Sequence, residues 1–289
     1  MMLSSISIFS KTSIRFGSSL RSFRGLKTAH VKKRPTQRPK RVILMRHGES
    51  LGNVDDSAYV TTPDWQVPLT EKGRQQAFEA GKELYDIVGP KGKVFFYYSP
   101  YIRTKDTLHE IQKYFNEDQI ISIREEPRIS EQQFGNFQNV EDVWESKQER
   151  HNFGRFYYRF PSGEAGLDVY SRVSSFISTL VRDCQQYQKA GYDLDEINVI
   201  IITHGLSLRL FLMRWFQFSV EEFEKSQNPE NAQLVVMNKK CHTGFRWYEL
   251  DEKHRKALNL PSWCTKPKNV ILHDLEGQMA NEKCPIEKK

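Results

Sequence analysis

Short apolar runs alternate along the chain with longer segments in which apolar residues recur every three or four positions. Four of the runs are nearly continuous in apolar or β-branched residues: RVILM (41–45), KVFFYYS (93–99), IISIRE (120–125) and NVIIITH (198–204). Such runs predict strands that are buried on both faces of a mostly parallel sheet covered by helices. Two later runs, QLVVMN (233–238) and GFRWYEL (244–250), predict an antiparallel pair.

Helical periodicity fills the segments between these strands. Residues 70–89 begin with a threonine that can cap a helix and end at a glycine. Residues 167–187 carry one apolar stripe at helical spacing, and residues 205–218 follow a strand directly. The alternation predicts an α/β fold with three layers, α/β/α, around a mostly parallel central sheet. We expect this domain to span residues 41–250.

The N-terminal segment differs in composition from the rest of the chain. The net charge of +7 comes from residues 1–48, which contain twelve Lys or Arg and no Asp or Glu. The segment 1–40 is rich in Ser and Arg and predicts a transit peptide followed by a linker, with a mitochondrion favoured over a plastid. A disordered basic tail, which would leave the protein in the cytoplasm, is the alternative. Residues 251–289 are polar and are predicted to form a C-terminal tail of uncertain order.

The composition also argues against several classes of function. Residues 49–289 contain 31 basic and 36 acidic residues, a net charge of −5, with no basic cluster of the kind that binds nucleic acid. No stretch reaches the length of about 18 apolar residues that a membrane span needs. The four cysteines include no C-x-x-C pair, and Cys241 with His242 is too small a set to predict a metal site.

Charged and polar residues follow the predicted parallel strands where each strand ends. Arg46 and His47 follow the first strand, Arg103 comes shortly after the second, Glu131 after the third and His204 after the fourth. Because the carboxyl ends of parallel strands lie at one edge of a sheet, where ligands bind in such folds, we expect these side chains to meet.

Two arginines and two histidines suit a phosphoryl group. Guanidinium groups bind phosphate oxygens through paired hydrogen bonds and remain charged. An imidazole can attack phosphorus and divide the transfer into two easier steps. A carboxylic acid can protonate the leaving oxygen, and its carboxylate can later take a proton from water. The residues therefore predict phosphoryl transfer, although each of them alone is commonplace.

Taken together, these motifs resemble those of the histidine phosphatase superfamily, also called phosphoglycerate-mutase-like. The resemblance covers about residues 41–250 and rests on five motifs: LMRHGES with Asn53 downstream, PLTEKGRQQA, YYSPYIRTKDT, SEQQFGNF and IITHGLSLR. Two further stretches, REEPRISEQQFGNFQ and FGRFYYRFPSGE, are similar to plant phosphoglycerate-mutase-like proteins and to the fungal broad-range acid phosphatase.

The resemblance implies a role for each candidate residue. His47 is the nucleophile that becomes phosphorylated, and Glu131 is the proton donor. The remaining residues bind the phosphate or lie beside it: Arg46, Asn53, Arg103 and His204. We expect the two arginines to lower the pKa of His47, because nearby positive charge disfavours the imidazolium. No metal or organic cofactor is implied, since His47 itself carries the phosphoryl group.

The sequence favours a phosphatase of the acid type that hydrolyses phosphomonoesters of small metabolites over a broad range and works best at mildly acidic pH. Residues 136–163 lack the Arg- and Pro-rich insertion of the mutase branch, which disfavours a mutase. A phosphoglycerate mutase, a sugar-bisphosphate phosphatase and a non-catalytic module that binds phosphorylated ligands remain alternatives. The sequence does not give the oligomeric state.

The same segment carries aromatic residues at helical spacing, from Phe153 to Phe160, with Arg155 and Arg159 on another side. This spacing predicts a helix that packs its aromatic residues on the core. The alternative is a lid whose arginine reaches an anionic substrate.

Overall fold

The structure is a computed structural model that describes residues 38–136, 140–242 and 245–265. Most of the predicted transit segment, residues 1–37, and residues 266–289 of the predicted tail lie outside the described residues. The strands are β1 (Arg41–Arg46), β2 (Lys93–Tyr98), β3 (Ile120–Glu125), β4 (Ile197–Thr203), β5 (Leu234–His242) and β6 (Phe245–Leu250).

Nine α-helices and four short 3₁₀ helices accompany these strands in the described residues. The α-helices are α1 (Leu51–Val54), α2 (Ala58–Thr61), α3 (Glu71–Val88), α4 (Ile102–Gln112), α5 (Val140–Phe153), α6 (Gly166–Lys189), α7 (Gly205–Phe216), α8 (Val220–Lys225) and α9 (Glu252–Ala257). The 3₁₀ helices are η1 (Asp64–Gln66), η2 (Glu117–Gln119), η3 (Pro127–Ile129) and η4 (Ser262–Thr265). No helix in the described part of the chain has the length and apolar character of a membrane span.

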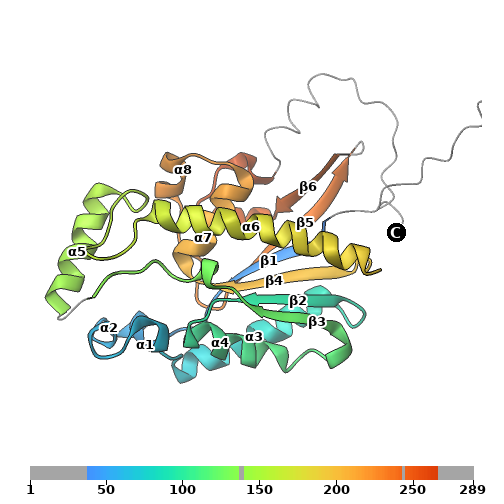
Figure 1. The fold of residues 1–289 in the computed structure, drawn as a ribbon, viewed down its shortest axis with the longest axis horizontal. Coiled ribbons are helices and arrows are strands. Elements are labelled where there is room, and N and C mark those ends of the chain that lie inside the picture. The colour runs from blue at the N-terminus through green and yellow to red at the C-terminus, as the bar shows by residue number, and fades with distance from the viewer. Residues whose placement is uncertain (1–37, 137–139, 243–244, 266–289) are drawn as a thin grey trace, which may run out of the picture. The chain divides into compact units, whose positions relative to one another are not determined.

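The described strands form one sheet in the order β3-β2-β4-β1-β5-β6. β3, β2, β4 and β1 are parallel, whereas β5 and β6 run antiparallel at the other end. This arrangement confirms the predicted mostly parallel sheet and the late antiparallel pair. Helices cover both faces, with α6 and α7 on one side and α3 and α4 on the other (Figure 1).

Alternation along β1 shows how the sheet divides the core into two layers. Val42 and Leu44 belong to the cluster that packs beneath α6 and α7, while Ile43 and Met45 belong to the cluster beneath α3 and α4. Successive side chains of a strand point to opposite faces, so a strand covered on both faces must be apolar throughout. This requirement explains the continuous apolar runs.

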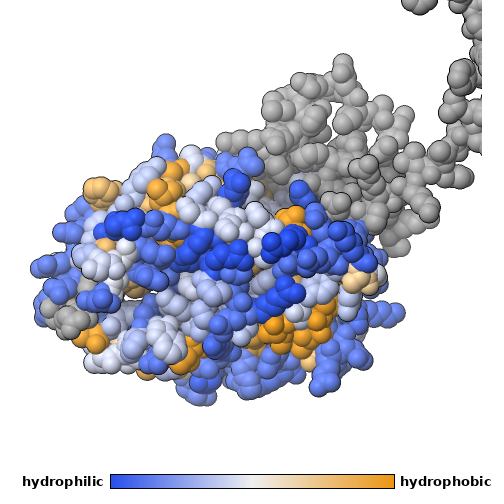
Figure 2. Space-filling model, viewed as in Figure 1, coloured by the Kyte–Doolittle hydropathy of each residue, from blue (hydrophilic) through white to orange (hydrophobic). Residues whose placement is uncertain are grey.

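β3 differs from the prediction because it lies at the edge of the sheet. Its residues are half-buried or exposed, and Ile123 is 41% exposed. Figure 2 shows hydrophobic residues at the surface over this strand. The prediction that residues 120–125 are buried on both faces is therefore wrong, because the helices that cover the central strands leave this edge strand partly exposed.

Residues beyond the predicted end of the domain also pack on the core. The segment 251–265 forms α9 and η4, and Leu258, Leu260 and Cys264 are buried among residues of the cluster beneath α6 and α7. The polar composition of this segment conceals these few apolar anchors.

Candidate active site

His47 follows the last residue of β1 and is buried, with 3% of its surface exposed. Its Nδ1 lies 2.6 Å from the carbonyl oxygen of Gly48. Because a carbonyl can only accept, Nδ1 carries the proton of the neutral ring and Nε2 keeps a lone pair. The local backbone thus selects the tautomer in which Nε2 can act as a nucleophile.

Gly48 allows the loop after His47 to pack closely on the start of α3. A Cβ at this position would lie 2.3 Å from the carbonyl oxygen of Gly73, closer than any side chain permits. The amide of Gly48 donates to Thr107 Oγ1 at 3.0 Å, which ties the loop to α4. The glycine after the histidine is therefore required by this contact.

His204 lies beside His47 because of the pairing of β1 with β4. The parallel register places Arg46 opposite Thr203, so each strand is followed at once by a histidine. The two rings are 5.2 Å apart between centroids. His204 is fully buried, and its Nε2 lies 2.8 Å from Ser99 Oγ at the end of β2.

Arg103 extends from the first turn of α4 into the same site. Its guanidinium is 2% exposed and donates through Nη1 to the carbonyl and carboxylate oxygens of Asp64, at 2.7 and 2.8 Å. It also lies over the ring of Tyr101, 4.7 Å from the centroid. Helices α4 and α7 both begin at this point, and the positive ends of helix dipoles favour an anion.

Two nitrogen atoms in this group have no hydrogen-bond partner among the described residues. They are Arg46 Nε and His204 Nδ1, both buried. Arg46 is held in place by a bond from Nη1 to the carbonyl of Pro229 at 3.0 Å. Buried polar atoms are nearly always satisfied in folded proteins, so unpaired atoms in a cationic site indicate a place for an anionic ligand.

Asn53 is linked to His47 through Asn231. Its side chain is exposed on α1, and its Oδ1 accepts from the amide and hydroxyl of Ser50 and from Asn231 Nδ2 at 3.1 Å. Asn231 Nδ2 also donates to the carbonyl of His47 at 3.2 Å. Asn53 therefore connects to the nucleophile through the backbone, and its contact with phosphate stays a prediction.

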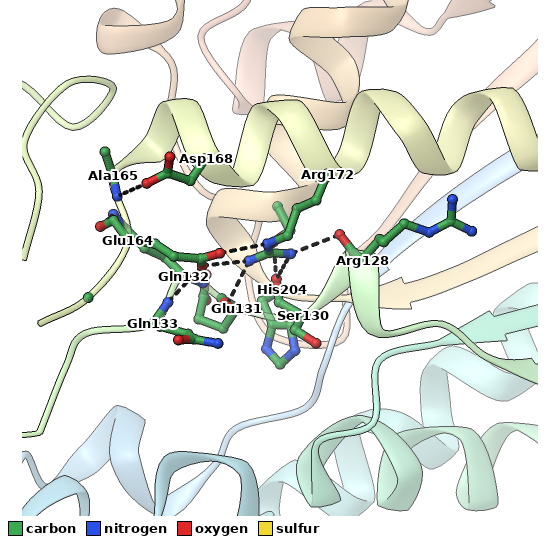
Figure 3. Close-up of polar contacts among 12 residues, drawn as sticks. Arg128, Ser130, Glu131, Gln132, Gln133, Glu164, Ala165, Asp168, Arg172 and His204 are labelled. Atoms are coloured by element: carbon green, nitrogen blue, oxygen red, sulfur yellow. Dashed lines mark hydrogen bonds and ion pairs between the residues drawn. The ribbon is translucent and has the colours of Figure 1, made fainter.

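Glu131 lies on the loop after β3, which Arg172 of α6 holds (Figure 3). The guanidinium of Arg172 donates to the carbonyl oxygens of Arg128, Ser130 and Glu131 at 2.8–2.9 Å. It is itself fixed by two bonds to the carboxylate of Glu164, at 3.1 and 3.0 Å. One side chain thus satisfies three backbone acceptors of the loop that carries Glu131.

Further bonds attach the same loop to the chain on either side. Glu164 accepts from the amide of Gln133, and its own carbonyl accepts from Gln132 Nε2. Ser207 Oγ, in the first turn of α7, donates to the carbonyl of Ser130. The position of Glu131 therefore depends on α6 and α7 as well as on its own strand.

Replacing Arg172 with lysine is expected to lower kcat by about tenfold or more while leaving KM within about twofold. An ammonium keeps the charge but cannot bond three carbonyls and Glu164 in one plane, so Glu131 would lose its alignment. Steady-state kinetics and a pH profile of Arg172→Lys test this expectation. Arg182→Lys is the matched control, because Arg182 lies on the same helix and is 65% exposed. Wild-type kcat and an unchanged profile in Arg172→Lys would refute a positioning role.

Burial shifts the pKa values of His47 and Glu131 in the directions that a nucleophile and a proton donor require. Burial lowers the pKa of His47 well below 6.5, and Arg103 and Arg46 lower it further. The pKa of His204 is lowered by burial and then by Arg103 and His47. Burial raises the pKa of Glu131 above 4.5, against the opposing effects of the Gln132 amide and Arg103. The predicted lowering of the His47 pKa is confirmed in direction, with burial as the larger cause.

These shifts predict a rate maximum at mildly acidic pH. Activity should fall as pH drops below the lowered pKa of His47, because the imidazolium has no lone pair. It should fall again as pH rises above the raised pKa of Glu131, because the carboxylate has no proton to donate. The pH dependence of kcat/KM with an alkyl phosphate measures both limits. A rate that rises steadily through pH 7 would contradict the assigned protonation states.

Several residues that build the site were missed by sequence reasoning. Each of them makes a contact with a residue 30 or more positions away in the chain; they are Asp64, Ser99, Tyr101, Glu164 and Arg172. Apart from Ser99 and Tyr101, which adjoin a predicted strand end, they carry no local signal in the sequence.

The insertion after the acid loop also differs from the prediction. α5 ends at Phe153, and Gly154 follows with a φ of +100°, so residues 153–160 do not form the predicted helix. Phe156 and Phe160 are buried as expected, whereas Phe153 and Tyr157 are 70% and 58% exposed, so the prediction that all these aromatic residues pack on the core is wrong.

The two arginines of this insertion have separate environments. Arg159 pairs with Asp168 at 2.7 Å. Arg155 instead lines a cavity of about 320 Å³ together with Lys147, Gln148, Arg150 and His151. Four basic side chains therefore face one cavity on the insertion.

Comparison with known proteins adds the following similarities. The family model of the histidine phosphatase superfamily, branch 1, matches residues 42–247. Phosphoglycerate mutase-like protein AT74H of Arabidopsis thaliana is 49% identical, over 69% of this chain and 74% of the relative. Broad-range acid phosphatase DET1 of Saccharomyces cerevisiae is 29% identical, over 78% of this chain and 91% of the relative.

A solved structure shows the same fold at lower sequence identity. A mycobacterial glucosyl-3-phosphoglycerate phosphatase in complex with VO3 superimposes with a TM-score of 0.56 and 18% identity. The alignment covers 73% of this chain and 97% of that protein.

Proposed function

This chain belongs to branch 1 of the histidine phosphatase superfamily, and we propose that it hydrolyses phosphomonoesters of small metabolites over a broad range through a phosphohistidine at His47. The family, and the phosphatases among its relatives, support phosphatase activity. The observation that carries the mechanism is the convergence of four basic side chains at the ends of the parallel strands: Arg46, His47, Arg103 and His204. Within this group Arg46 Nε and His204 Nδ1 are buried and have no hydrogen-bond partner among the described residues.

In the first step His47 Nε2 attacks phosphorus while the ester P–O bond breaks. Arg46, Arg103 and His204 stabilise the charge on the equatorial oxygens, because fixed donors in a buried site need no reorganisation. Glu131, protonated through its raised pKa, donates its proton to the leaving oxygen.

In the second step the Glu131 carboxylate takes a proton from water, whose oxygen attacks the phosphohistidine. The N–P bond breaks, inorganic phosphate leaves, and His47 returns to its neutral form with Nδ1–H still bonded to the Gly48 carbonyl. Both steps use the same carboxyl group in opposite protonation states.

Phosphate release by the full chain from a panel of phosphorylated metabolites and p-nitrophenyl phosphate tests the proposal. We expect turnover of many members of the panel, with kcat/KM values that differ by no more than about a hundredfold, because the phosphate contacts are common to all of them. Release from a single metabolite would refute the broad range. Release from none of them would refute the phosphatase and favour a binding module.

A sugar-bisphosphate phosphatase is the second candidate, and the basic cavity of Lys147, Arg150, His151 and Arg155 favours it. Within the described residues, the guanidinium groups of Arg150 and Arg155 have no ion-pair partner, whereas Lys147 pairs with Asp56 at 2.6 Å. Guanidinium groups without an ion-pair partner can bind a second phosphate. A strong preference for a bisphosphate over the matching monophosphate in the same panel would support this narrower function.

A further inference from the structure

A second cavity, of about 550 Å³, adjoins the phosphate-binding residues on the side of α2 and η1. Aromatic side chains from separate segments of the chain line much of it: Tyr59, Trp65, Tyr101 and Phe134. Trp65, on η1, is 51% exposed. Large apolar side chains that remain exposed in a concave site commonly mark a place where a ligand binds.

The cavity and the candidate active site share residues. Tyr101 lines the cavity, and its ring lies 4.9 Å from the ring of His204 and 4.7 Å from the Arg103 guanidinium. Asp64 also lines the cavity and binds Arg103 through two oxygen atoms. A phosphoryl group bound by Arg103 and His204 would therefore have its ester group next to this cavity.

The part of the cavity lining formed by Phe134 and Gly135 is built by close backbone packing. Gly135 has a φ of +94°, and a Cβ there would lie 2.1 Å from the carbonyl oxygen of Pro161. Only glycine fits this approach without strain. The neighbouring Phe134 ring packs 6.1 Å from Tyr59 and 5.0 Å from Phe160, between centroids. These contacts hold the Phe134 ring in place without a ligand.

The charge of the cavity indicates what it can hold. Among the described residues that line it, Asp64 is the only charged one, and its carboxylate is already paired with Arg103. The other polar side chains carry uncharged hydroxyls and amides and belong to Tyr59, Thr61, Thr62, Tyr101, Gln133, Asn136 and Ser162. Such a lining disfavours an anionic group, in contrast to the basic cavity on the insertion, and favours contact with an uncharged ring.

We propose that this cavity binds the leaving group of the substrate and selects phosphomonoesters whose alcohol carries an uncharged planar ring. The proposal rests on the proposed phosphatase function for its chemistry. The ring packs against Trp65 and Phe134, while the phosphoryl group lies against Arg103 and His204. Trp65 and Phe134 are specificity residues that touch the leaving group.

Kinetics of Trp65→Ala and Phe134→Ala on two substrates test the proposal. For phenyl phosphate we expect KM to rise about five- to tenfold, because the aromatic contact is lost. For glycerol 2-phosphate, which has no ring, we expect KM to remain within about twofold. Trp144→Ala is the matched control, since Trp144 is 60% exposed on α5 and lies outside the cavity lining, and it should change neither value. Equal changes for both substrates, or no change for either, would overturn the subsite.

A binding measurement separates this subsite from the phosphatase function. Titration calorimetry with phenylphosphonate and methylphosphonate compares a ring with a methyl group without any turnover. We expect the intact chain to bind phenylphosphonate about five- to tenfold more tightly, and Trp65→Ala to lose that difference. Equal affinities in the intact chain would overturn the subsite even if phosphate is released. A clear preference without any phosphate release would retain the subsite and overturn the proposed function alone.

Discussion

His47→Ala is expected to lower kcat for phosphate release by at least about 10⁴-fold, because it removes the atom that attacks phosphorus. The residual arginines and His204 can still bind phosphate, but in the proposed mechanism none of them attacks phosphorus. Inorganic phosphate should therefore still bind to the variant, while turnover is lost. Rapid quenching of the intact protein with substrate, followed by mass spectrometry of the peptide that contains His47, should locate the phosphoryl group.

Two controls make this expectation strict. His151→Ala removes an exposed imidazole from the basic cavity and should keep the phosphohistidine at His47. Because the substitution removes a buried ring and lowers stability, thermal unfolding is the second control, and it should show that His47→Ala still folds. A phosphoryl group found on another residue, or turnover within about tenfold of wild type in His47→Ala, would eliminate the phosphohistidine mechanism.

Glu131→Gln is expected to slow hydrolysis of the phosphohistidine for every substrate, but to slow phosphorylation of His47 only for substrates whose leaving oxygen needs a proton. An alkyl oxygen needs a proton to leave, so release of glycerol from glycerol 2-phosphate should slow by about 10²–10³-fold. p-Nitrophenolate leaves without a proton, so phosphorylation of His47 by p-nitrophenyl phosphate should remain fast. Attack by water on the phosphohistidine still needs the carboxylate. Stopped-flow absorbance should therefore show a burst of nitrophenolate followed by slow turnover.

The burst also discriminates Glu131 from other carboxylates of the same region. Glu125→Gln is the matched control, because Glu125 ends β3 and pairs with Lys105 at the surface. It should show no burst beyond that of the wild-type protein and should keep its turnover. An equal loss of rate for both substrates in Glu131→Gln, with no burst, would argue against its role as acid and base.

The strand ends explain why so much of the fold and site could be predicted from the sequence. A central parallel strand must be apolar on both faces, so β1 and β4 could be predicted from their uninterrupted apolar runs. The polar residues that follow these runs indicated the edge of the sheet where ligands bind. The structure brings Arg46, His47, Arg103 and His204 together at that edge. Their roles in catalysis stay predictions until the variants are measured.

The features that the sequence did not predict depend on long-range contacts or on single backbone angles. Arg172 contacts residues more than 40 positions before it, so nothing near it indicates a role in placing Glu131. The aromatic spacing from Phe153 to Phe160 fits a helix, but Gly154 adopts a positive φ and turns the chain. The spacing of apolar residues therefore predicts which residues are buried more reliably than it predicts the backbone conformation.

The register of β1 and β4 links the chemistry to the folding of the whole domain. The amide of His47 donates to the carbonyl of Thr203 at 3.0 Å, which extends the hydrogen bonding between β1 and β4 by one residue. Amides at such positions exchange with solvent mainly when the whole domain opens, so the two histidines should belong to the last cooperative unit to unfold. The rings of the 550 Å³ cavity come instead from peripheral loops and short helices. Substrate range can therefore drift through changes in those segments while the nucleophile and its phosphate contacts are maintained by the folding of the core.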